Sequence, residues 1–370
     1  MPDHALEPRQ SEDDQSSRLL VAASGTGGHL YPALAAAEAL EADYCVTWLG
    51  VSDRLETRLL PSKYELKTIP MEGFQTSLGL KTGIVLSKLV RSIIQTRRLL
   101  KQGQFEGVVT TGGYIAAPAI IAAYSLGLPS VLHESNVIPG KVTKWLSRWC
   151  SVIALGFKET APYLPNAHTV TVGTPVRSNF LAAAPLDLDI PEDAVVITVA
   201  GGSQGAVAVN RLVRQCAQSW LEEGAWIVHL TGERDGEADS FSHPHYRALS
   251  FCDNMAGLLQ RTNLAISRSG AGTLTELATT GTPSILIPYP YAAEDHQAYN
   301  AEVFVKAGAA QMFREADLTA ENFTETVLGL LRSPQRLAAM SAQAHQLSAA
   351  DSTQKFVQLI RQTLQIKDSG

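Results

Sequence analysis

The stretch Asn263–Asn300, NLAISRSGAGTLTELATTGTPSILIPYPYAAEDHQAYN, alternates apolar runs with a glycine turn and a helical run. Leu264–Ile266 has the composition of a short buried strand. Thr273–Thr280 is typical of a helix, and the glycine and proline that follow it are stop signals. Ser284–Ile287 then predicts the next strand. The order of strand, glycine turn, helix and strand predicts an α/β fold with a parallel sheet.

The glycine turn Ser267–Gly272 indicates an anion site. Such a turn leaves backbone N–H groups unpaired at the positive end of the following helix. Glu276 lies about one turn into that helix, where its carboxylate can accept hydrogen bonds from the hydroxyls of a ribose. Together these features predict a nucleotide site. The alternative is a capped helix whose acid only complements the helix dipole, and this stretch by itself leaves both open.

The composition is that of a chain with large apolar cores. Its 370 residues suffice for two domains, and 45% are hydrophobic while 18% are charged. A net charge of −6 argues against a general nucleic-acid binder. The cysteines are far apart and suggest neither a disulfide framework nor a zinc site, which fits a reducing compartment. They are Cys45, Cys150, Cys216 and Cys252.

Two segments are candidates for a signal peptide or a membrane span. Met1–Ser17 is polar and acidic, so we expect a disordered tail and not a signal peptide. Gly113–Leu132 carries no charge, but Pro118, Gly127 and Pro129 interrupt it. A buried core helix gives the same signal as a membrane span and is the favoured interpretation.

Three more segments repeat the pattern of apolar strand, glycine-rich turn and helix. Alternating strands and helices predict parallel sheets wound by right-handed crossovers. Ligands of such sheets bind beyond the carboxyl ends of the strands, where these turns lie. Two units fall in each half of the chain, so we expect two similar domains with a cleft between them. The three segments are Leu19–Ala23 with Ser24–His29, Gly107–Val109 with Thr110–Gly113, and Ala194–Ala200 with Gly201–Gly205.

The expected division is a tail over residues 1–17, a first domain over 18–176 and a second domain over 177–351. A helix over 352–367 is expected to cross back and complete the first domain. Ala182–Asp193, with two prolines and a run of acids, is typical of a linker or surface loop. Its Asp187-Leu188-Asp189 resembles a metal-binding acid pair but follows no strand, so a solvated turn is favoured and no metal site is expected.

The turn Gly25–His29 is not the dinucleotide fingerprint, which needs G-x-G-x-x-G and an acid about 20 residues further on. Gly27 and Gly28 allow a substrate to approach the backbone closely. His29 opens the helix, where the dipole favours the neutral imidazole that a general base needs. The alternative is that His29 merely caps a turn, but its place in the loop favours a site role.

Three further motifs place polar groups where predicted strands end. In Gly201–Gly205, Ser203 offers a hydroxyl and an N–H group to a phosphate, although a plain tight turn explains the motif equally well. The sequence HESN at residues 133–136 suits sugar recognition or proton transfer, with a polar loop as the alternative. Arg177 can neutralise a diphosphate or form a surface salt bridge.

The segment Met71–Lys101 mixes apolar and basic residues. This pattern suits a surface that lies on anionic lipid, and a core helix with a basic face explains it equally well. Lys141, Lys144 and Arg148 extend the basic pattern. The positions concerned are Phe74, Leu78, Leu80, Lys81, Ile84, Val85, Leu86, Lys88, Leu89, Arg91, Ile93, Ile94, Arg97, Arg98 and Lys101.

Seven motifs, in this order, resemble the bacterial MurG family of undecaprenyl-diphospho-muramoylpentapeptide N-acetylglucosaminyltransferases. They run from residue 25 to residue 301 and so cover most of the chain. A single motif of this kind is weak, whereas seven in order are a strong signal. The motifs are GTGGHLYPA, TTGGYIAAP, HESNVIPGK, GTPVR, GGSQGA, FCDNM and SRSGAGTLTELATTGTPSILIPYPYAAEDHQAYNA.

The resemblance implies a GT-B fold, with two Rossmann-like parallel-sheet domains facing an interdomain cleft. It implies inverting transfer of N-acetylglucosamine from UDP-GlcNAc to the C4 hydroxyl of the muramoyl sugar of lipid I, which gives lipid II for peptidoglycan. It implies neither metal nor cofactor and no nucleic acid as partner. The protein would be peripheral on the cytoplasmic face of the inner membrane, with Met71–Lys101 docked on anionic lipid.

The family's pattern also implies roles for single residues. His29 and Glu134 are the candidate catalytic groups, and His133 and Tyr114 would face the acceptor. Cys252 stands where the family's uracil contact is usually a larger aliphatic residue, so uracil affinity depends on whether backbone atoms make that contact. The implied donor contacts are Thr26, Gly27, Gly28, Asn136, Arg177, Ser203, Cys252, Ala271, Gly272, Thr273, Leu274, Thr275, Glu276 and Gln297.

The sequence leaves three alternatives open. Another lipid-linked transferase, such as a diacylglycerol glycosyltransferase, would share the donor half, but HESN followed by VIPGK favours the muramoyl acceptor by resemblance. A UDP-GlcNAc 2-epimerase has a similar fold, and the basic apolar segment speaks against it. A nucleotide-sugar sensor without activity is the third, and binding without turnover would support it.

Overall fold

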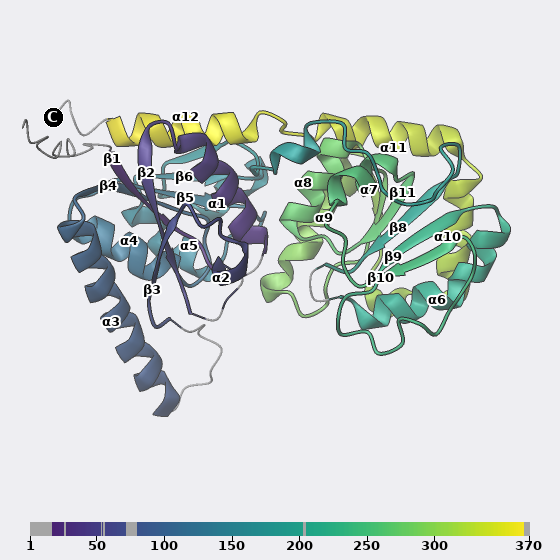
Figure 1. Cartoon of the computed structure of the whole chain (residues 1–370), viewed down its shortest axis with the longest axis horizontal. Coiled ribbons are helices and arrows are strands. Elements are labelled where there is room, and N and C mark those ends of the chain that lie inside the picture. The colour runs from purple at the N-terminus through teal and green to yellow at the C-terminus, as the bar shows by residue number, and fades with distance from the viewer. Residues whose placement is uncertain are drawn as a thin grey trace, which may run out of the picture.

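The computed structural model describes residues 17–25, 27–52, 54, 56–71, 80–202 and 205–365, which form two lobes side by side (Figure 1). The predicted tail therefore lies outside the described residues, apart from Ser17, which begins the first strand. The strands of the first lobe are β1 (Ser17–Ala22), β2 (Tyr44–Gly50), β3 (Glu65–Thr68), β4 (Phe105–Thr110), β5 (Ser130–Glu134), β6 (Val152–Leu155) and β7 (Thr169–Thr171). Those of the second lobe are β8 (Val196–Ala200), β9 (Trp226–Leu230), β10 (Tyr246–Leu249), β11 (Leu264–Ser267), β12 (Ser284–Leu286) and β13 (Ala310–Met312).

Each lobe is built on one parallel sheet. The first sheet has seven strands in the order β3-β2-β1-β4-β5-β6-β7, and the second has six in the order β10-β9-β8-β11-β12-β13. Leu19, Leu20 and Val21 of β1 are at most 1% exposed, as expected of a parallel strand covered on both faces. The predicted α/β fold with two parallel-sheet domains is confirmed.

Helices cover both sheets and continue the chain between strands. In the first lobe they are α1 (Gly27–Leu40), α2 (Glu56–Leu59), α3 (Leu80–Gln102), α4 (Ala116–Ser125) and α5 (Lys141–Leu146). In the second lobe they are α6 (Val207–Glu222), α7 (Met255–Arg261), α8 (Ala271–Thr280), α9 (His296–Lys306), α10 (Ala320–Leu331) and α11 (Pro334–Gln346), and α12 (Ser352–Gln365) follows. Short 3-10 turns are η1 (Ser147–Trp149), η2 (Lys158–Tyr163), η3 (Ser178–Phe180), η4 (Ala293–Asp295) and η5 (Glu315–Asp317).

The strand orders place all four predicted glycine turns at the switch points of the two sheets. In the first sheet, β1 pairs with β2 on one side and β4 on the other. In the second sheet, β8 lies between β9 and β11 in the same way. Successive connections leave such a pair of strands in opposite directions, which opens a crevice at their carboxyl ends. The turns after β1, β4, β8 and β11 therefore border the two crevices.

The last helix, α12, lies across the first lobe (Figure 1). Phe356 and Ile360 are buried in one cluster with Leu19 and Val21 of β1. A Cβ atom added at Gly107 of β4 would lie 2.2 Å from Leu364 Cδ2, so a side chain there would displace Leu364 of the helix. The hydrophobic face of α12 thus contributes to the core of the first sheet.

Two sequence interpretations are settled by burial. The uncharged window 113–132 forms the ten-residue helix α4 and then β5, both in the core, so the core interpretation is confirmed. None of the helices in the described ranges is long and apolar enough to span a bilayer. In the proline-bounded loop before β8, Leu186 and Leu188 pack against a core cluster while Asp187 and Asp189 are exposed, as expected of a solvated turn.

Candidate active site

The N-termini of α1 and α8 approach each other from the two lobes. A Cβ atom on Gly272 of α8 would lie 4.0 Å from the Cα atom of Gly28 in α1. The N-cap of α8 is Gly270, and no side chain caps the helix there. Its first N–H groups are therefore available to an anion, at the end of the helix where the dipole favours negative charge.

The glycine turn after β8 is held against the neighbouring loop. Gly205 has a φ of +71°, and a Cβ atom there would lie 2.6 Å from the carbonyl oxygen of Thr231. Only glycine fits that position without displacing backbone. Ser203 of this turn and Thr26 of the turn after β1, two predicted donor contacts, lie outside the described residues.

His29 is oriented by the turn after β4. Its Nδ1 lies 2.6 Å from the carbonyl oxygen of Thr111, and the Thr111 hydroxyl donates to the His29 carbonyl at 2.8 Å. A carbonyl can only accept, so Nδ1 carries a proton, and in the neutral ring Nε2 keeps its lone pair. Gly112 and Gly113, with φ of +91° and +75°, bring their backbone against the ring. The half-exposed His29 is therefore arranged to accept a proton through Nε2.

Arg177 and Glu276 form an ion pair beside α1. Arg177 Nη2 donates to Glu276 Oε1 at 3.0 Å, and the guanidinium lies 4.5 Å from the ring centroid of Tyr31 in α1. Burial raises the pKa of Glu276, and the charge of Arg177 opposes that rise. The residues predicted for the diphosphate and the ribose thus lie together, with Arg177 linking α1 to α8.

The carboxylate of Glu134 is occupied by the loop that follows β5. Oε1 accepts from the backbone N–H of Asn136 at 3.1 Å and from its side-chain amide at 3.2 Å. Oε2 accepts from the N–H of Gly140 at 3.0 Å and from the hydroxyl of Thr143 at 2.7 Å. Four donors fill the acceptor sites of a carboxylate. This geometry supports a loop-holding role and gives no support to the predicted catalytic role of Glu134.

His133 is turned away from the cleft. It is 0% exposed, its Nε2 donates to the carbonyl of Gly173 at 2.9 Å, and its ring lies against Phe356 of α12. Alternate residues of a strand face opposite sides of the sheet, and this side is covered by α12. The prediction that His133 faces the acceptor is therefore corrected. Tyr114, the other residue predicted to face the acceptor, is 42% exposed next to the glycines that pack on His29.

The remaining predicted donor contacts line the same edge of the second sheet. Leu274 is 0% exposed in the core, so only its backbone can meet a ligand. The Thr275 hydroxyl donates to the carbonyl of Ala271 at 2.9 Å, within the helix. Gln297 accepts from the N–H of Tyr289 at 2.9 Å and is half-buried. Cys252 is half-buried in the loop after β10, and burial raises the pKa of its thiol.

Asn136 contacts the second lobe through Asn300, a residue for which no sequence motif predicts a role. Asn300 Nδ2 donates to Asn136 Oδ1 at 3.0 Å, and its Oδ1 accepts from the N–H of Val137 at 2.9 Å. Asn300 is the last residue of the stretch that decides the fold, but an amide on a helix gives no signal of a partner more than 160 residues away. Within the described ranges, no group of three or more His, Cys, Asp or Glu side chains is placed to hold a metal ion.

The two buried histidines predict a loss of stability on mild acidification. Burial lowers the pKa of His133 and of His229 to about 4 each. In the unfolded chain both histidines are protonated near pH 6.5. Their neutral burial therefore costs no stability above that pH, and the free energy of unfolding falls as the pH is lowered from about 6.5 to about 4. At roughly 1.4 kcal/mol per pKa unit, the two together amount to several kcal/mol. Glu276, whose pKa is raised, changes in the opposite direction and offsets part of the loss.

Urea unfolding at a series of pH values measures this effect. The variants His133→Gln and His229→Gln should each reduce the dependence of the free energy of unfolding on pH. His168→Gln, at an exposed position, should leave that dependence unchanged. A free energy of unfolding that stays constant from pH 6.5 to 4.5 in the natural sequence would contradict the assignment of two neutral buried imidazoles.

Two parallel-sheet lobes that meet at the N-termini of α1 and α8 have the architecture of the two-domain glycosyltransferases of GT-B type. The model of the glycosyltransferase family 28 N-terminal domain matches residues 19–155, and that of the C-terminal domain matches residues 196–358. The chain therefore belongs to glycosyltransferase family 28.

Individual relatives are similar over nearly the whole chain. Two are named UDP-N-acetylglucosamine--N-acetylmuramyl-(pentapeptide) pyrophosphoryl-undecaprenol N-acetylglucosamine transferase. The one from Nostoc sp. (strain PCC 7120) is 61% identical over 351 residues, which are 94% of this chain and 98% of the relative. The one from Nostoc punctiforme is 60% identical over 351 residues, with the same coverage. The crystal structure of Acinetobacter baumannii MurG is 29% identical with a TM-score of 0.76, and the match covers 94% of this chain and 99% of that one. The resemblance to the MurG family is confirmed.

Proposed function

We propose that this chain transfers N-acetylglucosamine from UDP-GlcNAc to the C4 hydroxyl of the muramoyl sugar of lipid I, which gives lipid II. Relatives about 60% identical over nearly their whole length carry the name of this activity. The structural observation that carries the proposal is the pairing of the uncapped N-terminus of α8 with a histidine whose Nε2 is free to accept a proton.

The donor is proposed to bind mainly to the second lobe. Its diphosphate lies against the N–H groups of Gly270–Thr273, and its ribose hydroxyls donate to Glu276. Arg177 supplies positive charge beside the diphosphate, and Gln297 and Asn136 contact the sugar. Backbone at Cys252 contacts the uracil, and Gly27 and Gly28 contact the donor through their backbone.

The reaction is a single displacement. Oxygen O4 of the acceptor attacks the anomeric carbon of the donor, its proton passes to His29 Nε2, and the bond to the diphosphate breaks with its electron pair leaving on UDP. Negative charge grows on the leaving diphosphate in the transition state. Fixed N–H groups at a helix end and a guanidinium stabilise such charge without having to reorganise. Attack from the face opposite to the leaving group inverts the anomeric carbon.

The direct test is turnover of radiolabelled UDP-GlcNAc with a short-chain lipid I analogue. We expect label in the lipid product with the muramoyl acceptor and none with diacylglycerol. Transfer to diacylglycerol would indicate the other lipid-linked transferase, and conversion of the nucleotide sugar without any acceptor would indicate an epimerase. Binding of UDP-GlcNAc without turnover under any of these conditions would contradict an enzymatic function.

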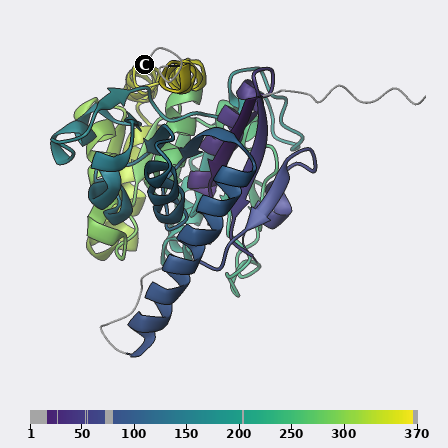
Figure 2. The same cartoon turned by 90° about the vertical axis from the view of Figure 1, so that its left-hand side faces the viewer.

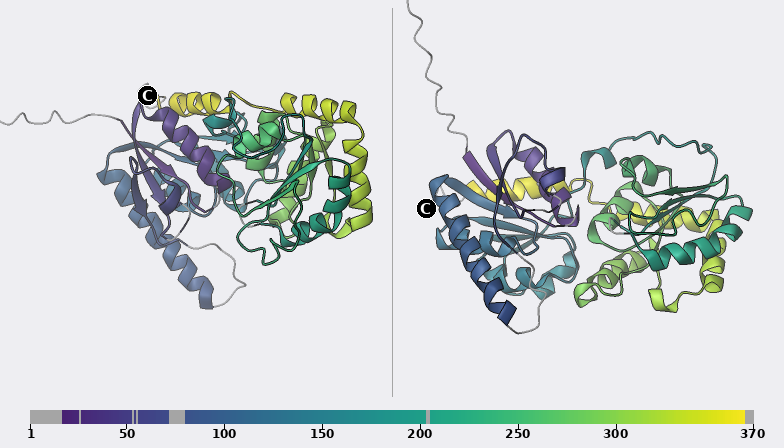
Figure 3. Two further views of the ribbon diagram at one scale, coloured as in Figure 1. Left: turned by 45° about the vertical axis from the view of Figure 1, so that its right-hand side comes forward. Right: turned by 60° about the horizontal axis from the view of Figure 1, so that its bottom comes forward.

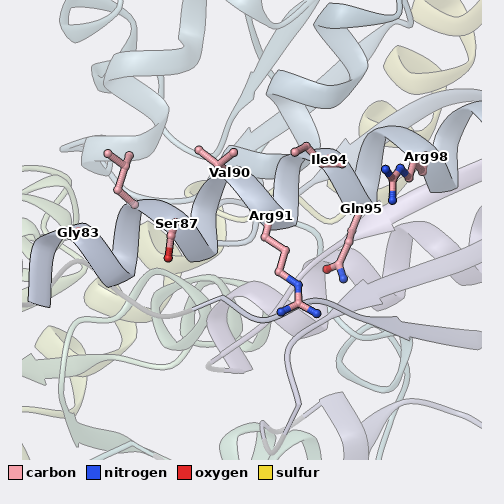
Figure 4. A pocket seen from close by; sticks show the side chains of 8 residues that line it. Gly83, Ser87, Val90, Arg91, Ile94, Gln95 and Arg98 are labelled. Atoms are coloured by element: carbon pink, nitrogen blue, oxygen red, sulfur yellow. The ribbon is translucent and has the colours of Figure 1, made fainter.

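The chain is further proposed to work at the cytoplasmic face of the inner membrane, docked through what we name the α3 surface. This helix extends beyond the rest of the first lobe (Figures 2 and 3). It borders an open groove of about 630 Å³, and Figure 4 shows Val90 and Ile94 on one side of the helix with Arg91 and Gln95 on the other. The exposed aliphatic residues are Ile84, Leu86, Val90 and Ile94, which are 45–57% exposed.

Exposed aliphatic groups beside arginines suit insertion at the surface of anionic lipid. Phe74 and Leu78, predicted to join this surface, lie outside the described residues. Lys144, predicted to extend it, is instead ion-paired with Glu294 of the second lobe. Lys141 and Arg148, also predicted to extend it, are exposed. The test of this docking concerns the part of the surface that α3 forms.

Reversing two charges on the α3 surface should release the protein from anionic vesicles. Each basic residue near such a surface contributes about 1 kcal/mol, so Arg91→Glu with Arg98→Glu should weaken binding at least about 10-fold. Co-sedimentation with vesicles containing phosphatidylglycerol measures this. Lys306→Glu with Arg336→Glu makes the same charge change on the second lobe and should have little effect. If the α3 variant sediments as the natural protein does, α3 is not the docking element.

A further inference from the structure

Asn300 joins the two lobes through one buried side-chain amide. It lies in α9 and is 0% exposed. Two of its hydrogen bonds cross to the first lobe, where Oδ1 accepts from Val137 N–H at 2.9 Å and Nδ2 donates to Asn136 Oδ1 at 3.0 Å. The same Nδ2 donates to the carbonyl of Ser269 in its own lobe at 3.3 Å. The amide thus makes three of the four hydrogen bonds of which it is capable.

In the first lobe, Asn136 is held rigidly. Its backbone N–H and its side-chain amide both donate to Glu134, and the other oxygen of Glu134 binds Gly140 and Thr143 at the start of α5. The hydroxyl of Thr160 also donates to the carbonyl of Asn136 at 2.9 Å. The oxygen that Asn136 presents to Asn300 is therefore fixed relative to the first sheet.

In the second lobe, Asn300 reaches the residue that precedes the N-cap of α8. Ser269 is 0% exposed, and its hydroxyl donates to the carbonyl of Gln297 in α9 at 2.7 Å. Ser269 is followed by Gly270, so the two bonds between α9 and Ser269 fix the position of the uncapped helix end. A continuous set of hydrogen bonds thus runs from Glu134 to the start of α8.

We propose that Asn300 is a positioning residue that sets the separation of His29 from the N-terminus of α8. The inference rests on the proposed function, because it concerns the alignment of the acceptor's base with the donor's leaving group. A different lobe orientation would leave a buried amide or N–H group unpaired, which is unfavourable. Asn300 touches neither substrate in this account, and it acts through Asn136 and Ser269.

The test compares Asn300→Ala, Asn136→Ala and the double variant in the full chain, with Glu294→Gln as the control. The control removes an ion pair between the lobes, that of Glu294 with Lys144, which is partly exposed and therefore contributes little. Turnover is measured with UDP-GlcNAc and the lipid I analogue, and affinity is measured by calorimetry with UDP. We expect kcat of Asn300→Ala to fall about 10- to 100-fold, since small misplacements of reacting groups have effects of that size. The affinity for UDP should stay within about threefold of that of the natural protein, because the variant keeps all proposed contacts to UDP.

The double variant should lose less than the product of the two single losses, since both changes break the bond between Asn136 and Asn300. Asn136→Ala also removes the proposed sugar contact, so its own loss is not diagnostic. If Asn300→Ala does not fold, Asn300→Ser makes the same test, because its shorter side chain keeps a polar group at the buried position and lacks the amide that binds Val137 and Asn136. A kcat within about twofold of the natural protein, equal losses in kcat and UDP affinity, or additive effects in the double variant would each overturn the inference. A natural protein without turnover would overturn the proposed function instead.

Discussion

Replacing His29 by alanine should lower kcat by about 10²- to 10⁴-fold, the range that a positioned general base contributes. Nδ1 of this ring donates to the Thr111 carbonyl, so in the neutral ring Nε2 carries the lone pair. The variant therefore loses the proton acceptor while the nucleotide contacts remain. The affinity for UDP should therefore be nearly unchanged. Steady-state kinetics with the lipid I analogue, together with calorimetry with UDP, separates the two effects.

A matched control for this variant is His168→Ala, which removes an exposed histidine of the same lobe. It should keep full activity. If His29→Ala also keeps full activity, His29 is not the base, and a group outside the geometry described above must take the proton. If it loses UDP affinity as strongly as turnover, its role is in donor binding.

The second large effect is expected at Glu276. A hydrogen bond to a charged group contributes about 1.5–3 kcal/mol, so Glu276→Ala should weaken UDP binding by roughly 10- to 100-fold. The carboxylate is proposed to accept from both ribose hydroxyls, and hence the variant should bind UDP and 2′-deoxy-UDP equally well. Competition between these two nucleotides, measured by calorimetry, checks the result.

Glu276→Gln serves as the comparison because it keeps an oxygen acceptor and loses the charge that pairs with Arg177. It should retain part of the preference for ribose over deoxyribose. An unchanged preference in Glu276→Ala would show that the ribose is recognised elsewhere, whatever happens to the overall affinity. Loss of affinity without loss of preference would assign Glu276 only to holding Arg177.

The fold could be predicted because its signals are local. The strands β1, β4, β8 and β11 are continuous apolar runs, and a glycine turn follows each of them. In the turns after β1, β4 and β8 a glycine has positive φ, as at Gly112 and Gly205, whereas Gly270 after β11 has a φ of −64°. The parallel sheets then fix that these turns lie at the carboxyl edges of strands. These local signals predict a cleft between two lobes even when the order and register of the strands are unknown.

The roles of single polar residues could not be predicted in the same way. His133 and Glu134 are neighbours on β5, and the sequence predicted a site role for both. His133 is instead buried against α12, and the carboxylate of Glu134 accepts hydrogen bonds from its own loop. Both outcomes depend on segments far along the chain or on loop conformation. The contact of Asn300 with Asn136 joins two lobes, so no local pattern announces it.

The proposed function depends on the uncapped start of α8, which is proposed to hold the diphosphate of the donor. A crystal structure of the protein with UDP tests it most directly. We expect the phosphate oxygens within hydrogen-bond distance of the backbone N–H groups of Gly270–Thr273, with the ribose against Glu276. UDP bound with its diphosphate anywhere else, such as on the glycine turns of the first lobe alone, would contradict the account.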